Sequence, residues 1–273
     1  MLQNMLENVR KTAPLIHNIT NYVTINDCAN ILLACGASPI MADDVNEVEE
    51  VTAICAGLNI NIGTLHQHTI PAMLKAGEKA NKLGHPVVFD PVGVGVSRFR
   101  IRTAHKLLEN VRFAAIRGNI SEIKTLAFGE GNTRGVDADI ADIVTEENLL
   151  QIVNFAKGFS RKTEAVIAIT GAIDIVTDGE KAYCIYNGHP MMRWVTGTGC
   201  QLSALTAAYV AATPSRPLEA VAAAVCAMGI CGEKAYERLT EKDGNAAYRN
   251  YIIDAVYRLD GEELENKAKY KIF

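Results

Sequence analysis

Short apolar runs alternate with longer amphipathic segments along most of the chain. The short runs are bounded by turn residues, as buried strands are, and the longer segments follow the helical period. The predicted strands cover residues 15–17, 39–41, 58–62, 86–90, 114–117, 165–170, 174–177 and 182–186. The predicted helices cover about residues 22–35, 67–83, 100–109, 120–128, 145–161, 199–212, 217–239 and 244–258. This alternation predicts βα units in an α/β fold with a mostly parallel sheet, and we expect residues 1–273 to form a single domain.

Four further segments have distinct local patterns. Asp178-Gly179 lies between two short strands and is typical of a hairpin turn, which predicts an antiparallel edge on the sheet. Residues 1–10 form an amphipathic helical pattern rather than a secretory signal. The glycine- and acid-rich stretch 129–139 is predicted to be an exposed loop, and the charged tail after Gly261 is expected to fray.

Composition favours small-molecule chemistry. The 273 residues are 49% hydrophobic and carry a net charge of −4, so nothing predicts binding to nucleic acid or to an anionic membrane. The glycine-broken, alanine-rich segment near 217–232 is too short and small-sided for a membrane span. Seven cysteines, an odd number without paired C-x-x-C spacing, lie mostly in apolar segments. We therefore expect reduced core cysteines and a cytoplasmic protein.

The segment Trp194-Val-Thr-Gly-Thr-Gly-Cys200 places two glycines immediately before an alanine-rich helix. Glycines allow close approach of the backbone to a ligand, and the free N–H groups at a helix start carry partial positive charge. The residues Gly197, Thr198, Gly199 and Cys200 are therefore candidates for an anion hole that receives a phosphate oxyanion. A plain loop-to-helix junction is the alternative, so this pattern needs independent support.

Two carboxylates follow predicted strands, at the edge of an α/β sheet where ligands collect. Asp90 ends a buried strand ahead of a glycine-rich turn, and Glu122 lies in the first turn of a helix. Mg²⁺ prefers such oxygen ligands, so this pair is a candidate metal site that acts through waters. The alternatives remain open: Asp90 is also a good turn-capping residue, and Asn119 with Glu122 fits a capping box.

Other polar residues lie at the same predicted edge. Arg117 offers a planar fork of donors for phosphate, and Thr170-Gly171 is able to line a nucleotide phosphate, although Thr170 is equally a plain strand residue. Asn21 is a candidate for polar contact with a substrate. Met41 ends a short strand, where a methionine is commonly a core residue.

Taken together, these segments resemble the hydroxyethylthiazole kinase family, the thiamin-salvage enzymes of the ribokinase superfamily. The resemblance runs from about residue 14 to 235 and rests on seven motifs: Pro14-Leu-Ile-His-Asn-Ile-Thr-Asn21, Gly36-Ala-Ser-Pro-Ile-Met-Ala42, Asn61-Ile-Gly-Thr64, Asp90-Pro-Val-Gly93, Ile116-Arg-Gly-Asn119, Ala168-Ile-Thr-Gly171 and Val195-Thr-Gly-Thr-Gly-Cys200. It implies a ribokinase-like three-layer α/β/α fold. It also implies transfer of the γ-phosphoryl group of ATP to the hydroxyl of 4-methyl-5-(2-hydroxyethyl)thiazole.

The resemblance also implies roles for individual residues. Arg117 and Thr170 match ATP contacts, and Met41 and Gly197 match thiazole contacts. Asn21 and Val23 match positions of additional pocket wall. The resemblance further implies a homotrimer with active sites between subunits.

Cys200 stands where the wider superfamily usually has an aspartate base. A thiol is a poor base unless its pKa is lowered, so we expect Cys200 to contact or orient the alcohol, and a Cys200→Asp variant to retain or gain activity. Two other functions stay open: a hydroxymethylpyrimidine-type kinase or related ATP-dependent repair dehydratase, and a catalytically silent nucleotide- or thiazole-binding protein.

Overall fold

The computed structural model describes residues 1–129 and 143–273, and its strands form one sheet in the order β2-β1-β3-β4-β5-β6-β7-β8-β9. The strands are β1 (Leu15–Ile19), β2 (Ser38–Met41), β3 (Gly57–Asn61), β4 (Val87–Asp90), β5 (Ala115–Asn119), β6 (Val166–Thr170), β7 (Asp174–Thr177), β8 (Ala182–Ile185) and β9 (Tyr270–Ile272). Neighbours from β2 to β6 pair in parallel, and the pairs from β6 to β9 are antiparallel. The predicted parallel sheet with an antiparallel edge is confirmed.

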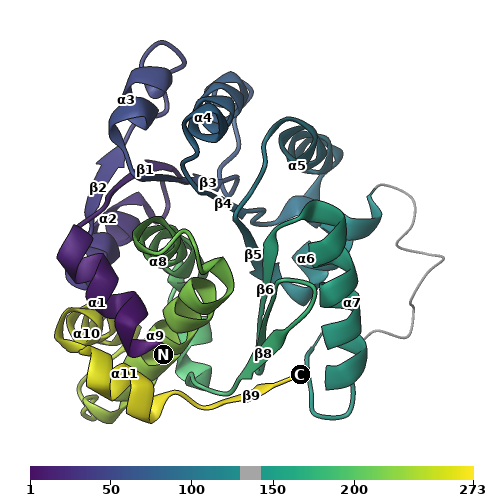
Figure 1. Cartoon of the computed structure of the whole chain (residues 1–273). Coiled ribbons are helices and arrows are strands. Elements are labelled where there is room, and N and C mark those ends of the chain that lie inside the picture. The colour runs from purple at the N-terminus through teal and green to yellow at the C-terminus, as the bar shows by residue number, and fades with distance from the viewer. Residues whose placement is uncertain (130–142) are drawn as a thin grey trace.

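Helices cover both faces of this sheet (Figure 1). Buried side chains of α3 (Val48–Ile54), α4 (Ile70–Leu83), α5 (Arg98–Asn110), α6 (Ile120–Phe128) and α7 (Leu149–Thr163) join one hydrophobic core. A second core on the other face includes α1 (Gln3–Thr12), α2 (Ile25–Cys35), α8 (Thr198–Ala212), α9 (Pro217–Glu237), α10 (Asn245–Arg258) and α11 (Gly261–Lys267). The expected three-layer α/β/α arrangement is therefore confirmed. Helix α8 is buried along nearly its whole length, which fixes its first turn against the sheet.

The predicted hairpin forms between β7 and β8. Gly179 has a φ of 94°, in the left-handed region that glycine tolerates, and the side chain of Asp178 accepts hydrogen bonds from the backbone N–H groups of Glu180 and Lys181. The amphipathic N-terminal segment forms α1 as expected, and its buried face joins the core beneath α8.

The expectation of a fraying tail is wrong. The side chain of Asp260 caps α11 by accepting from the N–H of Glu263, and Glu263 forms ion pairs with Lys234 and Lys267. Beyond this helix, β9 pairs with β8 and completes the sheet. The charges of the tail are therefore paired with the body of the protein instead of being fully solvated.

Sequence patterns also missed helix α3 and set some boundaries incorrectly. Helix α2 begins at Ile25, so Tyr22 and Val23 lie in the preceding turn, and α8 begins at Thr198 rather than at residue 199. The predicted loop 129–139 lies outside the described residues except for Gly129.

Within the described ranges, no helix is both long and apolar enough to cross a membrane. All seven cysteines are free and buried, as predicted.

Candidate active site

The carboxyl ends of the parallel strands meet the first turn of α8. Side chains alternate between the two faces of a strand, so residues at matching positions of neighbouring strands point to the same helix layer. The pairing of β3 with β4 sets Asn61 beside Asp90, and Arg117 and Thr170 follow on β5 and β6. These polar groups and α8 therefore form one cluster at the sheet edge where α/β proteins bind ligands.

The N-terminus of α8 approaches the loop after β1 closely. Gly197 precedes the helix with a φ of 88°, and a Cβ on it would overlap Cγ2 of Thr24. Only glycine fits this position without strain. No described group accepts a hydrogen bond from the N–H groups of Thr198, Gly199 and Cys200. The turn therefore has free N–H donors that are available to an anion.

Asp90 lies fully buried at the centre of this cluster. Its Oδ2 accepts hydrogen bonds from Nδ2 of Asn61 (2.8 Å) and the hydroxyl of Ser203 (2.7 Å), and its Oδ1 lies 3.5 Å from a guanidinium nitrogen of Arg117. Burial raises the pKa of this carboxyl to about 6, with Arg117 opposing the rise and the charge of Glu122 adding to it. The hydrogen bonds that Asp90 accepts come from side chains, so the alternative in which it caps the backbone turn is wrong.

Arg117 lies between this carboxylate and the start of α8. Its Nη2 donates to the hydroxyl of Thr170 at 2.7 Å, while its buried Nε has no hydrogen-bond partner among the described residues. A Cβ on Gly199 would lie 2.5 Å from both terminal nitrogens of the guanidinium, so Gly199 makes room for it. A guanidinium next to free helix N–H groups concentrates positive charge, which favours binding of a phosphate.

Glu122 has the structural role that the capping alternative predicted. It forms a capping box with Asn119, and its second oxygen accepts from the N–H of Gly93 at 2.8 Å. Both carboxylate oxygens therefore already hold backbone groups. The described residues contain no cluster of three or more potential metal ligands. The donor set fits a cation held through waters and substrate phosphates rather than by a cage of side chains, and the buried Oδ1 of Asp90 has no hydrogen-bond partner in the described chain.

Cys200 contacts two asparagines. Nδ2 of Asn21 donates to its sulfur at 3.2 Å, and Nδ2 of Asn61 donates to it at 3.3 Å. Burial raises the pKa of the thiol above its ordinary value, the charge of Asp90 adds to the rise, and hydrogen bonds with Thr24 and Asn21 oppose it. The thiol is therefore protonated at neutral pH, and the start of the helix does not activate it as a base.

The remaining candidates lie around this cluster. Asn21 is buried, Met41 is partly buried at the end of β2, and Val23 is exposed beside Asn21. Sequence reasoning missed Asn61 and Ser203 as site residues. Asn61 could have been found from the same signal as Asp90, because each is a polar residue at the end of a buried strand. Ser203 showed no signal in the sequence, because only the packing of α8 on β4 brings it to Asp90.

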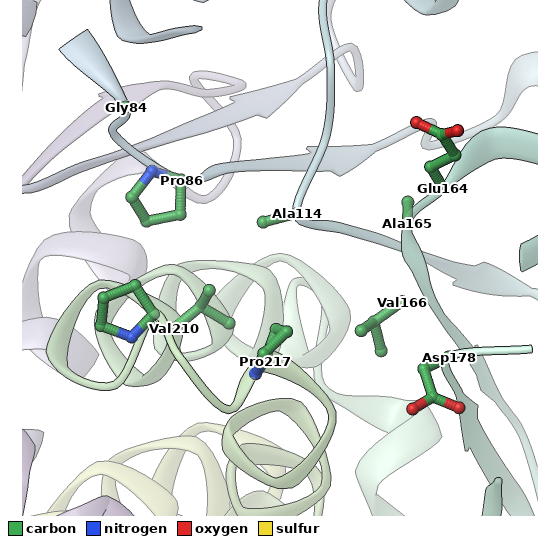
Figure 2. A pocket seen from close by; sticks show the side chains of 10 residues that line it. Gly84, Pro86, Ala114, Glu164, Ala165, Val166, Asp178, Val210 and Pro217 are labelled. Carbon is green, nitrogen blue, oxygen red and sulfur yellow. The ribbon is translucent and has the colours of Figure 1, made fainter. Parts of the chain in front are cut away.

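A cavity of about 330 Å³ lies at the opposite edge of the sheet (Figure 2). It is lined by residues at the amino ends of β4, β5 and β6 together with the end of α8 and the start of α9. Most of its lining is apolar, and Glu164 and Asp178 supply its two carboxylates. None of the candidate site residues lines this cavity, so its position does not indicate the active site.

Arg100 of α5 joins the loops that follow β3 and β4. Its guanidinium donates to the carbonyls of Ile62, Val92 and Gly63. We expect Arg100→Lys to lower the free energy of unfolding by about 1–3 kcal/mol, because an ammonium cannot span three carbonyls as a planar fork does. Urea denaturation measures this change. Arg98→Lys, in an exposed position on the same helix, is the control, and equal stabilities of the two variants would contradict the assigned role.

The order of the sheet and its two helix layers define a ribokinase-like α/β fold. A ribokinase-like superfamily protein from Enterococcus faecalis V583 shares the fold with a TM-score of 0.62 at 13% identity, over 94% of this chain and 89% of that chain. The model of the hydroxyethylthiazole kinase family matches residues 6–262. The chain belongs to the hydroxyethylthiazole kinase family.

Two relatives support this assignment over the full length of the chain. A hydroxyethylthiazole kinase from Clostridium acetobutylicum is 66% identical over 273 residues, which is 100% of both chains. The structure of a hydroxyethylthiazole kinase protein from Pyrococcus horikoshii OT3 superposes with a TM-score of 0.88 at 38% identity, covering 100% of this chain and 98% of that one.

Proposed function

We propose that this enzyme transfers the γ-phosphoryl group of ATP to the hydroxyl of 4-methyl-5-(2-hydroxyethyl)thiazole, giving the thiazole phosphate and ADP for thiamin biosynthesis. Family membership supports the reaction, and one structural observation supports its location. The free N–H groups of Thr198, Gly199 and Cys200 lie beside the guanidinium of Arg117. Phosphoryl transfer depends mainly on placing the acceptor in line and neutralising charge on the transferred oxygens. The backbone N–H groups of this turn and the guanidinium beside it are donors that can neutralise that charge.

The roles proposed for the polar residues come from the resemblance, and their contacts support them. Arg117 and Thr170, which are already hydrogen-bonded to each other, bind the phosphates of ATP. The amides of Gly197, Thr198, Gly199 and Cys200 form the anion hole. Mg²⁺ bound with ATP would neutralise phosphate charge, and Asp90 and Glu122 would hold it through waters.

The thiazole pocket is formed by Met41, Gly197, Asn21 and Val23. From the resemblance we propose a homotrimer with active sites between subunits. Val23 and Tyr22 are 59% and 64% exposed next to the buried Asn21, which leaves room for a neighbouring subunit on this side of the pocket. Seven buried free thiols support a reducing, cytoplasmic location.

A product assay tests the reaction. We expect ADP release and a phosphorylated product when the enzyme receives ATP, Mg²⁺ and the thiazole alcohol, and much less of both with hydroxymethylpyrimidine or pyridoxal. Coupled ADP detection and mass spectrometry of the products measure both outcomes, with an enzyme-free reaction and chelated Mg²⁺ as controls. Phosphorylation of the pyrimidine alcohol alone would assign a different kinase activity. ADP release at background level with every alcohol would indicate a binding protein instead.

A further inference from the structure

His17 is a fully buried histidine of β1 whose two ring nitrogens both have partners. Its Nε2 lies 2.8 Å from the carbonyl oxygen of Ala42, and its Nδ1 lies 2.9 Å from the hydroxyl of Thr52. A carbonyl oxygen only accepts, so Nε2 carries the hydrogen and donates it, and Nδ1 accepts from the hydroxyl. Burial lowers the pKa of the ring, and the hydrogen bond to Ala42 opposes this change. The neighbours of the ring therefore hold it neutral and in one tautomer.

The ring of His17 lies behind the sheet as seen from the candidate active site. Successive side chains of a strand point to opposite faces, and Ile16, which precedes His17, joins the core that contains α8. Thr52, which His17 contacts, belongs to α3 on the other face. Met41 pairs with Asn18 in the register of β1 and β2, so its side chain shares the face of α8, where it packs against the core. Met41 and the ring of His17 thus lie on opposite sides of the sheet.

The hydrogen bond to Ala42 fixes the backbone that follows Met41. Strand β2 lies at the edge of the sheet and pairs with β1 alone in the described chain, and all four of its residues are exposed or partly buried. Its pairing with β1 ends at Met41, and Ala42 is the next residue. Because the hydroxyl of Thr52 holds the other side of the ring, His17 joins the end of β2 to both β1 and α3.

We infer that His17 is a positioning residue that holds Met41 against the aromatic ring of the substrate and so sets the affinity for the heterocyclic alcohol. This role rests on the proposed function, in which Met41 contacts the thiazole. A thioether packs favourably on an aromatic ring, but a gap of about 1 Å forfeits up to half of such a contact. ATP and the transferred phosphoryl group bind at the start of α8 in the proposed mechanism, so His17 acts on binding of the alcohol alone.

Two substitutions separate the two hydrogen bonds of His17. The amide nitrogen of glutamine can take the place of Nε2 and donate to Ala42, whereas the shorter asparagine reaches only the place of Nδ1. We expect His17→Asn to raise KM for the thiazole alcohol about tenfold or more, while kcat and KM for ATP stay within about threefold of wild type. His17→Gln should bring KM for the alcohol back to within about threefold of wild type. Steady-state assays measure these constants, and His85→Asn, in the loop before β4 at the opposite edge of the sheet, is the control.

A double-mutant cycle shows whether His17 acts through Met41. Met41→Ala should itself raise KM for the alcohol, and in that background His17→Asn should add less than about threefold, because the two residues act through one contact. An unchanged KM for the alcohol in either single variant would overturn the inference. So would an effect of His17→Asn that persists in full in the Met41→Ala background, or one that changes kcat and both KM values together, because that pattern marks general damage to the fold.

A crystal structure of the wild-type enzyme with the thiazole alcohol provides a test that does not depend on the folding of any variant. We expect the thiazole ring to contact the side chain of Met41, with Nε2 of His17 still at hydrogen-bond distance from the carbonyl of Ala42. A ring bound away from Met41, or a broken bond between His17 and Ala42, would overturn the inference. Failure of the wild-type enzyme to phosphorylate the thiazole alcohol in the product assay would instead overturn the proposed function.

Discussion

Replacing Asp90 with asparagine is expected to lower kcat by on the order of a thousandfold, the largest effect of any single substitution in this site. The substitution keeps the shape of the side chain but removes the negative charge that balances Arg117 and that would hold the cation in the proposed mechanism. Steady-state assays with the thiazole alcohol measure the loss. A kcat within a few-fold of the wild-type value would show that this charge is not needed.

The same carboxyl should set the acid limb of the pH profile. Burial raises its pKa to about 6, so Asp90 takes up a proton as the pH falls through 6, and kcat/KM should decline there. Asp174 is a second desolvated carboxyl in this region, with a pKa raised by burial to about 7. We expect the decline of kcat/KM near pH 6 to persist in the Asp174→Asn variant. If the decline disappears in that variant, it is caused by Asp174 and not by Asp90.

The raised pKa of Asp90 also determines how the stability of the protein changes with pH. Between about pH 4 and 6 the folded protein holds a proton on Asp90 that the unfolded chain has already lost, so stability from this group falls as the pH rises through that window. The Asp90→Asn variant has no carboxyl at this position, so it does not lose this stability as the pH rises. The stability of the variant relative to the wild type should therefore increase between pH 4 and pH 7, by roughly 3 kcal/mol at most. Urea denaturation at the two pH values measures the difference.

Replacing Gly199 with alanine is expected to lower kcat by about 100-fold without removing any charged or polar group. The added Cβ would lie 2.5 Å from both terminal nitrogens of Arg117, so the guanidinium must move away from the start of α8. We expect KM for ATP to rise as well, because Arg117 binds its phosphates in the proposed mechanism.

Gly158→Ala is the matched control for this substitution. Gly158 lies in helix α7 and is exposed, and a Cβ added to it would meet no atom within 4 Å. Alanine there should raise the free energy of unfolding by about 0.5–1 kcal/mol through helix propensity and leave turnover unchanged. Equal activities of the Gly199 and Gly158 variants would contradict the assigned position of Arg117.

The sequence predicted the part of the site that depends on strand ends. Asp90, Arg117 and Thr170 follow apolar runs, and the geometry of a parallel sheet alone brings such residues to one edge. It did not predict which of them touch. The contact of Asn61 with Asp90 depends on the register of two strands, and that of Ser203 depends on how α8 lies across them. A local sequence pattern specifies neither the register of two strands nor the position of α8 across them.

The same limit explains the errors in the fold. Charge in the tail predicted fraying, but Glu263 pairs with Lys234 of a different helix, and the last strand forms because β8 offers an unpaired edge. For Cys200, the sequence left open whether the helix start lowers the pKa of the thiol. Burial and the neighbouring charge of Asp90 raise this pKa instead, and both depend on distant parts of the chain.

The pairing of β9 with β8 has a consequence for solubility. Strand β9 covers the backbone N–H and C=O groups along one side of β8. An exposed strand edge is a template for pairing with other chains. A variant that lacks residues 270–272 would expose this side of β8 and tend to aggregate, even where the candidate active-site cluster is intact.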